Sequence, residues 1–348
     1  MESKDKRKVA VIILEYKPAV WFAAKQHIDL LISAGCEVSL FCLEETSSEF
    51  LKSNYRTFVF PNLIKLISSK YLKSVQIIWT IDFMTILKIY PFLIFKKKKI
   101  VYWVQGDVPA ESFLRHRNKF REFVLRTIER IAFCVSKSYV FVSDSMSEYY
   151  EKKYSIAKKG KIVVPCLSEF ADYKVQKTKI PNSFVYIGGM SAWQCFEKIV
   201  SLYKQIKTEN TIFHIITLDV EKAKAMVLRE ISDTENIKIY SIKERAKIPE
   251  ILSQFERGFL IREESSVNFV SSPIKFLEYL SCNVDVIISK TIPSYAKIVE
   301  EEKVGLVLKS NDKIKALPPF SGNARKVYTK MFDKSVFVDR YKRLIYNM

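Results

Sequence analysis

The chain has 348 residues, 48% of them hydrophobic, which is too long for one ordinary core and predicts two folded domains. The net charge of +19 at pH 7 suits an anionic partner, but the sequence contains no nucleic-acid recognition motif, so we expect no nucleic-acid partner. The six cysteines are scattered, without a CxxC pair or partnering histidines, which argues against a disulfide framework and against a bound metal.

The amino-terminal residues are charged and lead directly into an apolar strand, without the hydrophobic segment of a secretory signal. We therefore expect a cytoplasmic protein. Residues 75–95 are apolar enough to suggest a membrane span, but Asp82, Lys88 and Pro91 interrupt them. A buried strand over 75–80 and a helix that ends near residue 95, with Asp82 as its N-cap, explain the pattern better.

The first half of the chain alternates β-branched apolar runs with amphipathic segments. Gly35 stands where a helix C-terminus needs a residue that tolerates positive φ. Ser143-Asp144 has the composition of a helix N-cap. The predicted strands are 9–14, 37–43, 57–60, 75–80, 100–104, 139–142 and 162–164, and the predicted helices are 20–34, 82–95, 118–135 and one beginning at Ser143-Asp144. Strands separated by helical crossovers predict a parallel, doubly wound sheet.

Residues 165–181 are polar, basic and bounded by prolines, and they are interpreted as a linker. Beyond them the alternation restarts. The predicted strands are 184–187, 212–217, 237–240, 258–261, 284–288 and 305–308, and the predicted helices are 192–206, 220–229, 248–255, 273–280, 295–301 and 323–346.

The predicted fold is therefore α/β, with two tandem Rossmann-like, doubly wound domains. The domains are residues 1–172 and 173–322, and a C-terminal helix over 323–348 packs across both. Ligands of such sheets bind at the carboxyl ends of the strands, so we expect a cleft between the two domains there.

Glycine is scarce, with 8 residues in the chain, and Gly188-Gly189 is the one pair. The pair follows a predicted strand and precedes a helix. Two residues without Cβ atoms let the backbone approach a phosphate or a sugar and leave helix N–H groups directed at it. A tight turn without a ligand remains the alternative, because a lone glycine signature is weak.

A second candidate lies between residues 262 and 280, where a strand ends at Arg262 and a helix opens after a loop. Ser272 is predicted as the N-cap and Pro273 as the first helical residue. Free N–H groups, the helix dipole and serine hydroxyls together form an anion site suited to a diphosphate. Lys275 and Glu278 share one face of this helix, where they would meet phosphate and ribose hydroxyls. A solvent-exposed Lys–Glu pair on an ordinary helix is the alternative.

The string Ser272-Pro-Ile-Lys275-Phe-Leu-Glu278, preceded by Arg262-Glu263, resembles the donor-binding region of retaining family 4 glycosyltransferases with the GT-B fold. Residues 184–191 resemble the first strand and loop of that family's C-terminal domain. Residues 101–111 resemble the acceptor-side loop of its bacterial cell-surface polysaccharide members.

This resemblance implies a hexosyltransferase that moves a sugar from a nucleoside-diphosphate sugar, foremost a UDP-sugar, to a glycan or lipid-linked acceptor with retention and without a metal or other cofactor. Glu278 would hold the ribose, while Arg262 and Lys275 would meet the charge that develops on the diphosphate. The donor residues implied are Gly188, Gly189, Ser271, Ser272, Lys275 and Glu278. The acceptor residues implied are Gln105, Gly106, Asp107 and Glu111.

The sequence departs from the family pattern in three places. Val270 stands where many members carry an earlier glutamate, residues 15–19 replace a glycine-rich loop, and Ala192-Trp193-Gln194 replaces a usual basic residue. Val270 and the altered first loop keep open a non-catalytic membrane-surface partner that retains the fold, and the shared architecture keeps open a nucleotide-sugar 2-epimerase.

Two features bear on these alternatives. The three histidines, His27, His116 and His214, stand singly, and each is interpreted as structural because it lacks an adjacent partner for general-base chemistry. The basic run 96–99 and the cluster Arg115, Arg117, Lys119 and Arg121 are interpreted as facing an anionic membrane, on the inner face of the cell membrane. A solvated basic surface is the simpler alternative.

Overall fold

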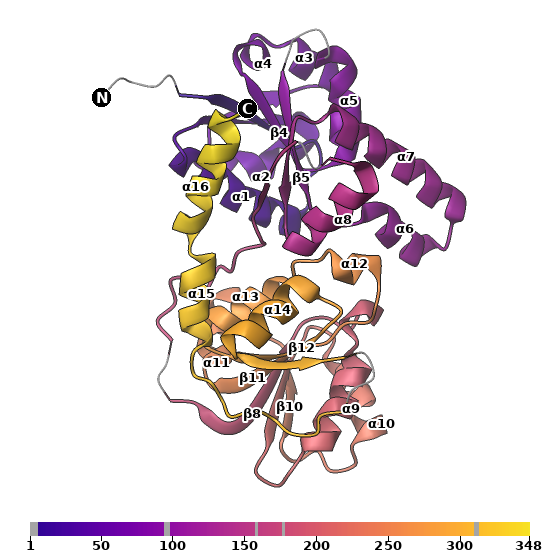
Figure 1. Cartoon of the computed structure of the whole chain (residues 1–348), viewed down its shortest axis with the longest axis vertical. Helices are drawn as coiled ribbons and strands as arrows, with labels where there is room; N and C mark the ends of the chain where they lie inside the picture. The colour runs from indigo at the N-terminus through magenta and orange to yellow at the C-terminus, as the bar shows by residue number, and fades with distance from the viewer. Residues whose placement is uncertain (1–5, 94–97, 157–158, 176–177, 310–312) are drawn as a thin grey trace. The chain divides into compact units, whose positions relative to one another are not determined.

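The computed structural model describes residues 6–93, 98–156, 159–175, 178–309 and 313–348. The chain forms two compact units (Figure 1). Unit 1 comprises Met1–Pro165 and Lys334–Met348, and unit 2 comprises Cys166–Asp333. Each unit is built on its own parallel sheet flanked by helices, so the predicted α/β fold with two Rossmann-like domains is confirmed.

Within the described residues, unit 1 contains a parallel sheet of order β3-β2-β1-β4-β5-β6-β7. The strands are β1 (Lys8–Ile12), β2 (Glu37–Leu43), β3 (Thr57–Phe60), β4 (Ile77–Thr80), β5 (Lys99–Val104), β6 (Ser138–Phe141) and β7 (Gly160–Val163). The strand order reverses between β1 and β4, which is the switch point of a doubly wound sheet. The central strands are buried except at Lys8 and Lys99, the first residues of β1 and β5, as expected of parallel strands covered on both faces.

The helices of unit 1 begin and end largely where local chemistry predicts. Gly35 has φ +89° directly after the C-cap of the first helix, and Asp82 accepts the Thr85 N–H at 2.6 Å, as an N-cap does. Ser143 likewise accepts the Met146 N–H. The helices are α1 (Pro18–Ser33), α2 (Ser47–Leu51), α3 (Leu63–Ser68), α4 (Lys70–Ser74), α5 (Phe83–Leu93), α6 (Val108–His116), α7 (Lys119–Val135), α8 (Asp144–Tyr154) and α16 (Lys334–Tyr346), with a 3₁₀ turn η1 (Glu44–Thr46).

Residues 75–93 fold as β4 and α5, as predicted in place of a membrane span. In the part of the chain that the structure describes, no helix has both the length and the apolar character that a bilayer crossing requires. Of the basic run 96–99, Lys96 and Lys97 lie outside the described residues. The Lys98 ammonium donates to the carbonyls of Lys73 and Val75, so this side chain is engaged within the unit.

Unit 2 contains, within the described residues, a parallel sheet of order β10-β9-β8-β11-β12-β13. Its strands are β8 (Ile180–Ile187), β9 (Ile212–Ile216), β10 (Ile237–Tyr240), β11 (Phe255–Leu260), β12 (Asp285–Ser289) and β13 (Gly305–Leu308). Its helices are α9 (Phe196–Ile206), α10 (Val220–Glu230), α11 (Ile248–Leu252), α12 (Ser266–Phe269), α13 (Ile274–Ser281), α14 (Pro293–Glu302) and α15 (Ala324–Phe332), with 3₁₀ turns η3 (Ala192–Gln194) and η4 (Arg245–Lys247).

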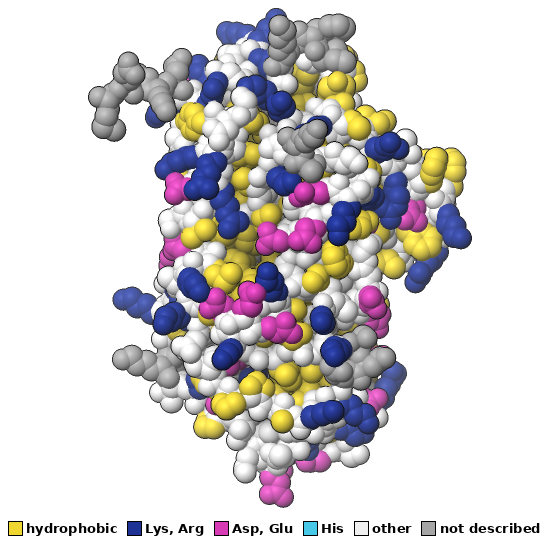
Figure 2. Space-filling view, viewed as in Figure 1, with side chains coloured by type: hydrophobic (Ala, Val, Ile, Leu, Met, Phe, Trp, Pro, Cys, Tyr) yellow, Lys and Arg dark blue, Asp and Glu magenta, His cyan; other side chains and the backbone are white. Residues whose placement is uncertain are grey.

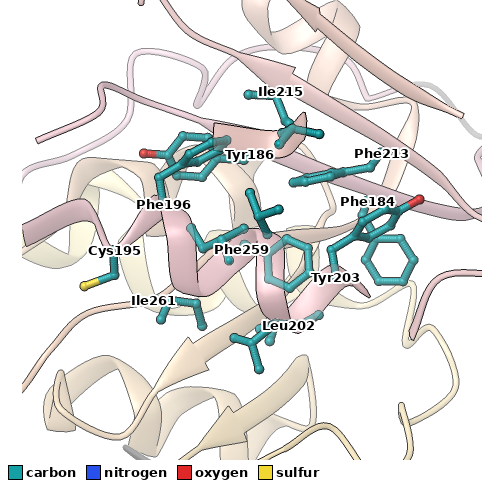
Figure 3. Packing of buried hydrophobic residues seen from close by; sticks show 14 of the residues in the cluster. Phe184, Tyr186, Cys195, Phe196, Leu202, Tyr203, Phe213, Ile215, Phe259 and Ile261 are labelled. Atoms are coloured by element: carbon teal, nitrogen blue, oxygen red, sulfur yellow. The ribbon is translucent and has the colours of Figure 1, made fainter. Parts of the chain in front are cut away.

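Aromatic side chains fill the core of unit 2 between the sheet and α9 (Figure 3). Phe184 on β8 stacks on Phe259 of β11 with ring centroids 5.8 Å apart, and Tyr203 of α9 packs on Phe213 of β9 at 4.6 Å. These side chains are fully buried. The first contact joins β8 to β11, so it fixes the two strands whose carboxyl ends carry Gly188 and Arg262, and the second joins α9 to β9.

The unit boundaries differ from the predicted ones. Unit 2 begins at Cys166 because the segment after it is bonded to α13: the Ser168 and Ser281 hydroxyls lie 3.1 Å apart, and Ser168 is buried. The predicted single helix over 323–346 is two helices, because Asp333 is extended between α15 and α16. Helix α15 packs on α13 in unit 2, and α16 packs on α1 in unit 1.

Local predictions failed at two helix ends in unit 2. The helix predicted over 248–255 ends at Leu252, and Phe255 opens β11, where its fully buried ring joins the core. Ser272 is not the N-cap of α13. Pro273 takes that position with extended ψ of 114° and no side-chain cap, since the Ser272 hydroxyl pairs instead with the Tyr295 hydroxyl at 2.5 Å.

Candidate functional site

The candidate site lies at the switch point of the unit 2 sheet. Strands β8 and β11 are neighbours, but the chain continues from β8 to β9 on one side and from β11 to β12 on the other. Gly188 and Gly189 follow β8, and Arg262 follows β11, so both flank the position where doubly wound sheets bind their ligands. The Tyr279 hydroxyl of α13 accepts the Ile187 N–H at 3.2 Å and contacts the Phe259 carbonyl at 3.3 Å. Tyr279 therefore holds α13 against both strands.

Gly188 makes room for a buried lysine. Its φ is +149°, and a Cβ atom there would lie 2.6 Å from Lys275 Nζ and 3.1 Å from the Tyr186 hydroxyl. Gly189 differs, since its nearest neighbour would be Asp219 Oδ2 at 3.9 Å. The structure thus brings Gly188 and Lys275 together across 87 residues of sequence.

Gly188→Ala is expected to lower the free energy of unfolding by about 1–3 kcal/mol, because the backbone conformation and the lysine both resist a Cβ atom. Gly189→Ala is the matched control and should change stability much less, since its surroundings are open. Urea unfolding of the two variants measures the difference. Equal stability of both variants would contradict the role given to Gly188.

Arg262 and Lys275 are adjacent buried cations, with 5% and 7% of their surfaces exposed. The Lys275 ammonium donates to Gln194 Oε1 at 2.8 Å and lies 4.4 Å from the centre of the Tyr186 ring. Arg262 donates through Nη1 to the Ile261 carbonyl. Within the described residues, neither cation forms an ion pair with a carboxylate.

Burial makes both charges costly. Desolvation, reinforced by the charge of Arg262 and only partly opposed by that of Glu278, lowers the pKa of Lys275 well below its usual range, and desolvation also lowers the pKa of Arg262. A buried charge without an ion-pair partner in direct contact destabilises a fold. An anion that reached these two side chains would remove that cost, so the arrangement is suited to a phosphate or diphosphate.

Glu278 lies one helical turn from Lys275 and is 3% exposed, so the solvent-exposed Lys–Glu pair is wrong. Its Oε1 accepts from Arg245 Nη2 at 2.6 Å, and Arg245 Nε donates to Glu169 Oε2 at 2.5 Å. Burial raises the pKa of Glu278, while the charges of Arg245 and Lys275 oppose the rise. Arg245 thus supports the ionised form of a carboxylate that burial alone would neutralise.

The predicted serines lie at the start of α13 with partners of their own. The Ser271 hydroxyl donates to the Asn268 carbonyl at 2.8 Å, and the Ser272 hydroxyl accepts the Cys166 N–H at 3.2 Å. No side chain caps α13, and the Phe276 N–H donates to the Pro273 carbonyl at 2.9 Å, so the N–H groups of Ile274 and Lys275 are the ones that an anion at this helix end would meet. Val270, at the position where the resemblance implies a glutamate, is fully buried at the end of α12.

The predicted acceptor residues lie after β5 of unit 1. Gln105 donates to the Ile81 carbonyl at 3.3 Å, and a Cβ atom on Gly106 would lie 2.6 Å from Glu111 Oε1. Glu111 is half-buried in the first turn of α6, and burial raises its pKa, with Arg115 opposing the rise. Gln105 and Gly106 thus form a loop beside the Glu111 carboxyl group in the first turn of α6.

Asp107 lies in the same segment but points into the unit. It is fully buried as the N-cap of α6, where Oδ1 accepts from Ala110 N–H and Arg126 and Oδ2 accepts from the Tyr149 hydroxyl at 2.9 Å. Asp107 therefore opens helix α6, whose first residues are Val108 and Pro109. With both oxygens engaged, the Asp107 carboxylate supports the segment from within.

Sequence patterns alone did not identify Arg245, Glu169 and Asp219. Arg245 contacts Glu278, and Glu169 contacts Arg245, across long stretches of sequence, and such contacts leave no local signal. Asp219 had such a signal, because it follows β9 beside the glycine pair; its carboxylate accepts the Met190 N–H at 3.3 Å. Gln194 fills the position where a basic residue was expected, and it holds the Lys275 ammonium.

Of the histidines, His27 and His214 are structural as predicted. His27 is buried, its Nδ1 lies 2.5 Å from the Tyr341 hydroxyl of α16, and burial lowers its pKa to about 3. His214 on β9 pairs with the Tyr240 hydroxyl, and burial lowers its pKa to about 4.

No protein-family model and no curated protein sequence matches the chain. Solved structures match it over nearly its whole length. HepE of Anabaena, solved with UDP and glucose, superposes with a TM-score of 0.70 at 12% identity, covering 98% of this chain and 100% of HepE. Sucrose-phosphate synthase of Thermosynechococcus elongatus gives 0.60 at 12%, covering 98% and 94%. The lipopolysaccharide outer core galactosyltransferase WaaB gives 0.58 at 16%, covering 97% and 95%. The two parallel sheets and this likeness over nearly the whole chain show that the protein has the two-domain GT-B fold.

Proposed function

We propose that the protein is a retaining glycosyltransferase of the family 4 type. It transfers a hexose from a nucleoside-diphosphate sugar, foremost a UDP-sugar, to a glycan or lipid-linked acceptor in cell-surface polysaccharide synthesis. The observation that carries the proposal is the pair of buried cations, Arg262 and Lys275, at the switch point of the unit 2 sheet. The solved complexes of HepE with UDP and with UDP-glucose support a donor of this kind.

In this proposal the donor diphosphate lies between the first turn of α13 and the loop after β8. Arg262 and Lys275 supply the opposite charges, and Gly188 and Gly189 let the backbone approach the phosphates and the sugar. Ser271 and Ser272 border the same helix end. As the bond to the sugar breaks, negative charge grows on the diphosphate, and fixed cations and N–H dipoles stabilise it without a metal ion.

Glu278 would accept hydrogen bonds from the two ribose hydroxyls. Both oxygens of an ionised carboxylate carry lone pairs, and Arg245 donates to one of these oxygens, Oε1. On the acceptor side, Gln105, Gly106 and Glu111 would contact the incoming hydroxyl, with Asp107 as their internal support. The cleft between the two sets of residues stays a prediction. We place the protein in the cytoplasm, at the inner face of the cell membrane.

A thermal-shift screen tests the donor proposal. UDP-, GDP- and ADP-sugars are added to the purified protein, and a UDP-sugar at 100 times its Kd should stabilise the fold by about 2.7 kcal/mol. Sugars without a nucleotide are the control and should leave the melting temperature unchanged. No response to any nucleotide sugar would contradict the proposal.

Product analysis separates transfer from the alternatives. An epimerase would convert a UDP-sugar alone into its epimer, which proton NMR detects, whereas a transferase needs an acceptor. Nucleotide-sugar binding without product over a broad acceptor screen would favour a non-catalytic role.

A further inference from the structure

A cluster of exposed aromatic and basic side chains lies where α6 meets α7 in unit 1. We call it the hairpin surface; it consists of Arg115, Arg117, Lys119, Phe120, Arg121 and Phe123. Phe120 is 76% exposed and Phe123 is 68% exposed, although phenylalanine is normally a core residue. Figure 2 shows apolar and basic side chains together over the region that α6 and α7 occupy in Figure 1.

The apolar residues continue along one face of α7. Phe120, Val124 and Ile131 are exposed at helical spacing, whereas Ala132 and Phe133 are fully buried on the other face. Helix α7 therefore already has a face that packs on the sheet, and its outer apolar face is additional. A solvated basic helix would carry polar residues there, so the simpler interpretation of the cluster does not explain these side chains.

On helices α6 and α7 the cations of the hairpin surface are exposed, whereas the nearby carboxylates of Glu122 and Glu129 are paired or buried. The carboxylate of Glu122 binds Arg126 at 2.6 Å, and that of Glu129 is fully buried against Lys153 and two tyrosine hydroxyls. Arg115, Arg117 and Lys119 are exposed. An approaching surface would meet positive charge between aromatic rings.

We propose that the hairpin surface docks the protein on an anionic lipid bilayer, with Phe120 and Phe123 inserted at the headgroup level and the basic side chains on lipid phosphates. Interleaved rings and cations are typical of helices that lie in a membrane interface. A second copy of the chain would meet like charge, which opposes self-association through this surface. The docking goes beyond sugar transfer and does not depend on it.

Vesicle sedimentation tests the proposal on the full chain, with phosphatidylcholine vesicles that contain or lack phosphatidylglycerol. The wild-type protein should bind the anionic vesicles and lose binding as salt rises. Phe120→Ser with Phe123→Ser should weaken binding at least about tenfold. Arg115→Gln with Lys119→Gln should weaken it roughly thirtyfold, at about 1 kcal/mol per charge. Leu218→Ser with Leu228→Ser, at positions 81% and 63% exposed in unit 2, is the matched control and should bind like wild type.

The melting temperature of every variant is measured and reveals a folding defect. The shift of the melting temperature with nucleotide sugar tests donor binding separately from membrane docking. Wild-type binding to neutral and anionic vesicles alike, or no binding to either, would overturn the proposal. So would hairpin variants that bind as well as the Leu218 and Leu228 control. A change of sedimentation coefficient in the hairpin variants without lipid would instead assign the surface to contact between protein molecules.

Discussion

Lys275→Met is expected to stabilise the unliganded protein by about 1–3 kcal/mol while it weakens nucleotide-sugar binding at least about 30-fold. Methionine matches the length of the lysine and removes a charge that is 7% exposed and close to Arg262. Gln194 is half-exposed, so water can replace the lost ammonium partner. Stability and binding then change in opposite directions, which is expected of a side chain kept for a ligand and not for the fold.

The stability gain should depend on pH with a definite sign. The folded pKa of Lys275 is lowered, so between that pKa and about 10.4 the unfolded chain binds more protons and wild-type stability rises with pH. The gain in the free energy of unfolding from Lys275→Met should therefore be largest at pH values below the Lys275 pKa of the folded protein. It should vanish near the pKa of the unfolded chain. Urea unfolding across pH measures it, with Lys224→Met on the exposed face of α10 as control. A variant less stable than wild type at neutral pH would refute the argument.

The strands could be predicted from the sequence because they are buried on both faces. Ile77–Thr80 and Lys99–Val104 are nearly continuous apolar runs, and such runs need no knowledge of distant contacts. Helices with a local cap were equally accessible: Asp82 and Ser143 each accept an N–H three residues ahead.

Positions decided by distant partners could not be predicted. Phe255 looks helical locally but belongs to β11, where the core takes its ring. Ser272 has the composition of an N-cap, yet Tyr295 takes its hydroxyl. Asp107 follows a strand as a ligand-binding residue would, but Arg126 and Tyr149 hold it inside the unit. In each case tertiary contacts outweigh a preference of about 1 kcal/mol.

The candidate site divides in the same way. Lys275 and Glu278 were visible because they share one helix face, and Gly188 because it follows a strand. The burial of Lys275 and Glu278 could not be predicted from the sequence, and the proposal of an anion site depends on it. An exposed lysine three residues from a glutamate is stabilised by water and gives no reason to expect a phosphate. Arg245 was missed because it reaches Glu278 from a turn 33 residues away.

Glu278→Gln is expected to lower the affinity for UDP and UDP-sugars about 10- to 100-fold, at about 1.5–3 kcal/mol for hydrogen bonds to a charged group. Glutamine has one acceptor oxygen where the carboxylate has two, and Arg245 already uses Oε1. Because Glu278 is assigned to the ribose, inorganic pyrophosphate should bind this variant as it binds wild type, whereas Lys275→Met should weaken both ligands. Calorimetry with the two ligands distinguishes the roles.

Arg245→Met extends the test to the group that supports the carboxylate. Without the guanidinium at 2.6 Å, burial should raise the pKa of Glu278 further, so that donor binding falls at low pH and recovers as pH rises. Glu169→Gln is the matched control: it removes the other partner of Arg245 and leaves the contact with Glu278 in place. A pH-independent loss in Arg245→Met would assign Arg245 a structural role. Unchanged UDP affinity in Glu278→Gln would refute the ribose assignment and leave the anion site on Arg262 and Lys275 alone.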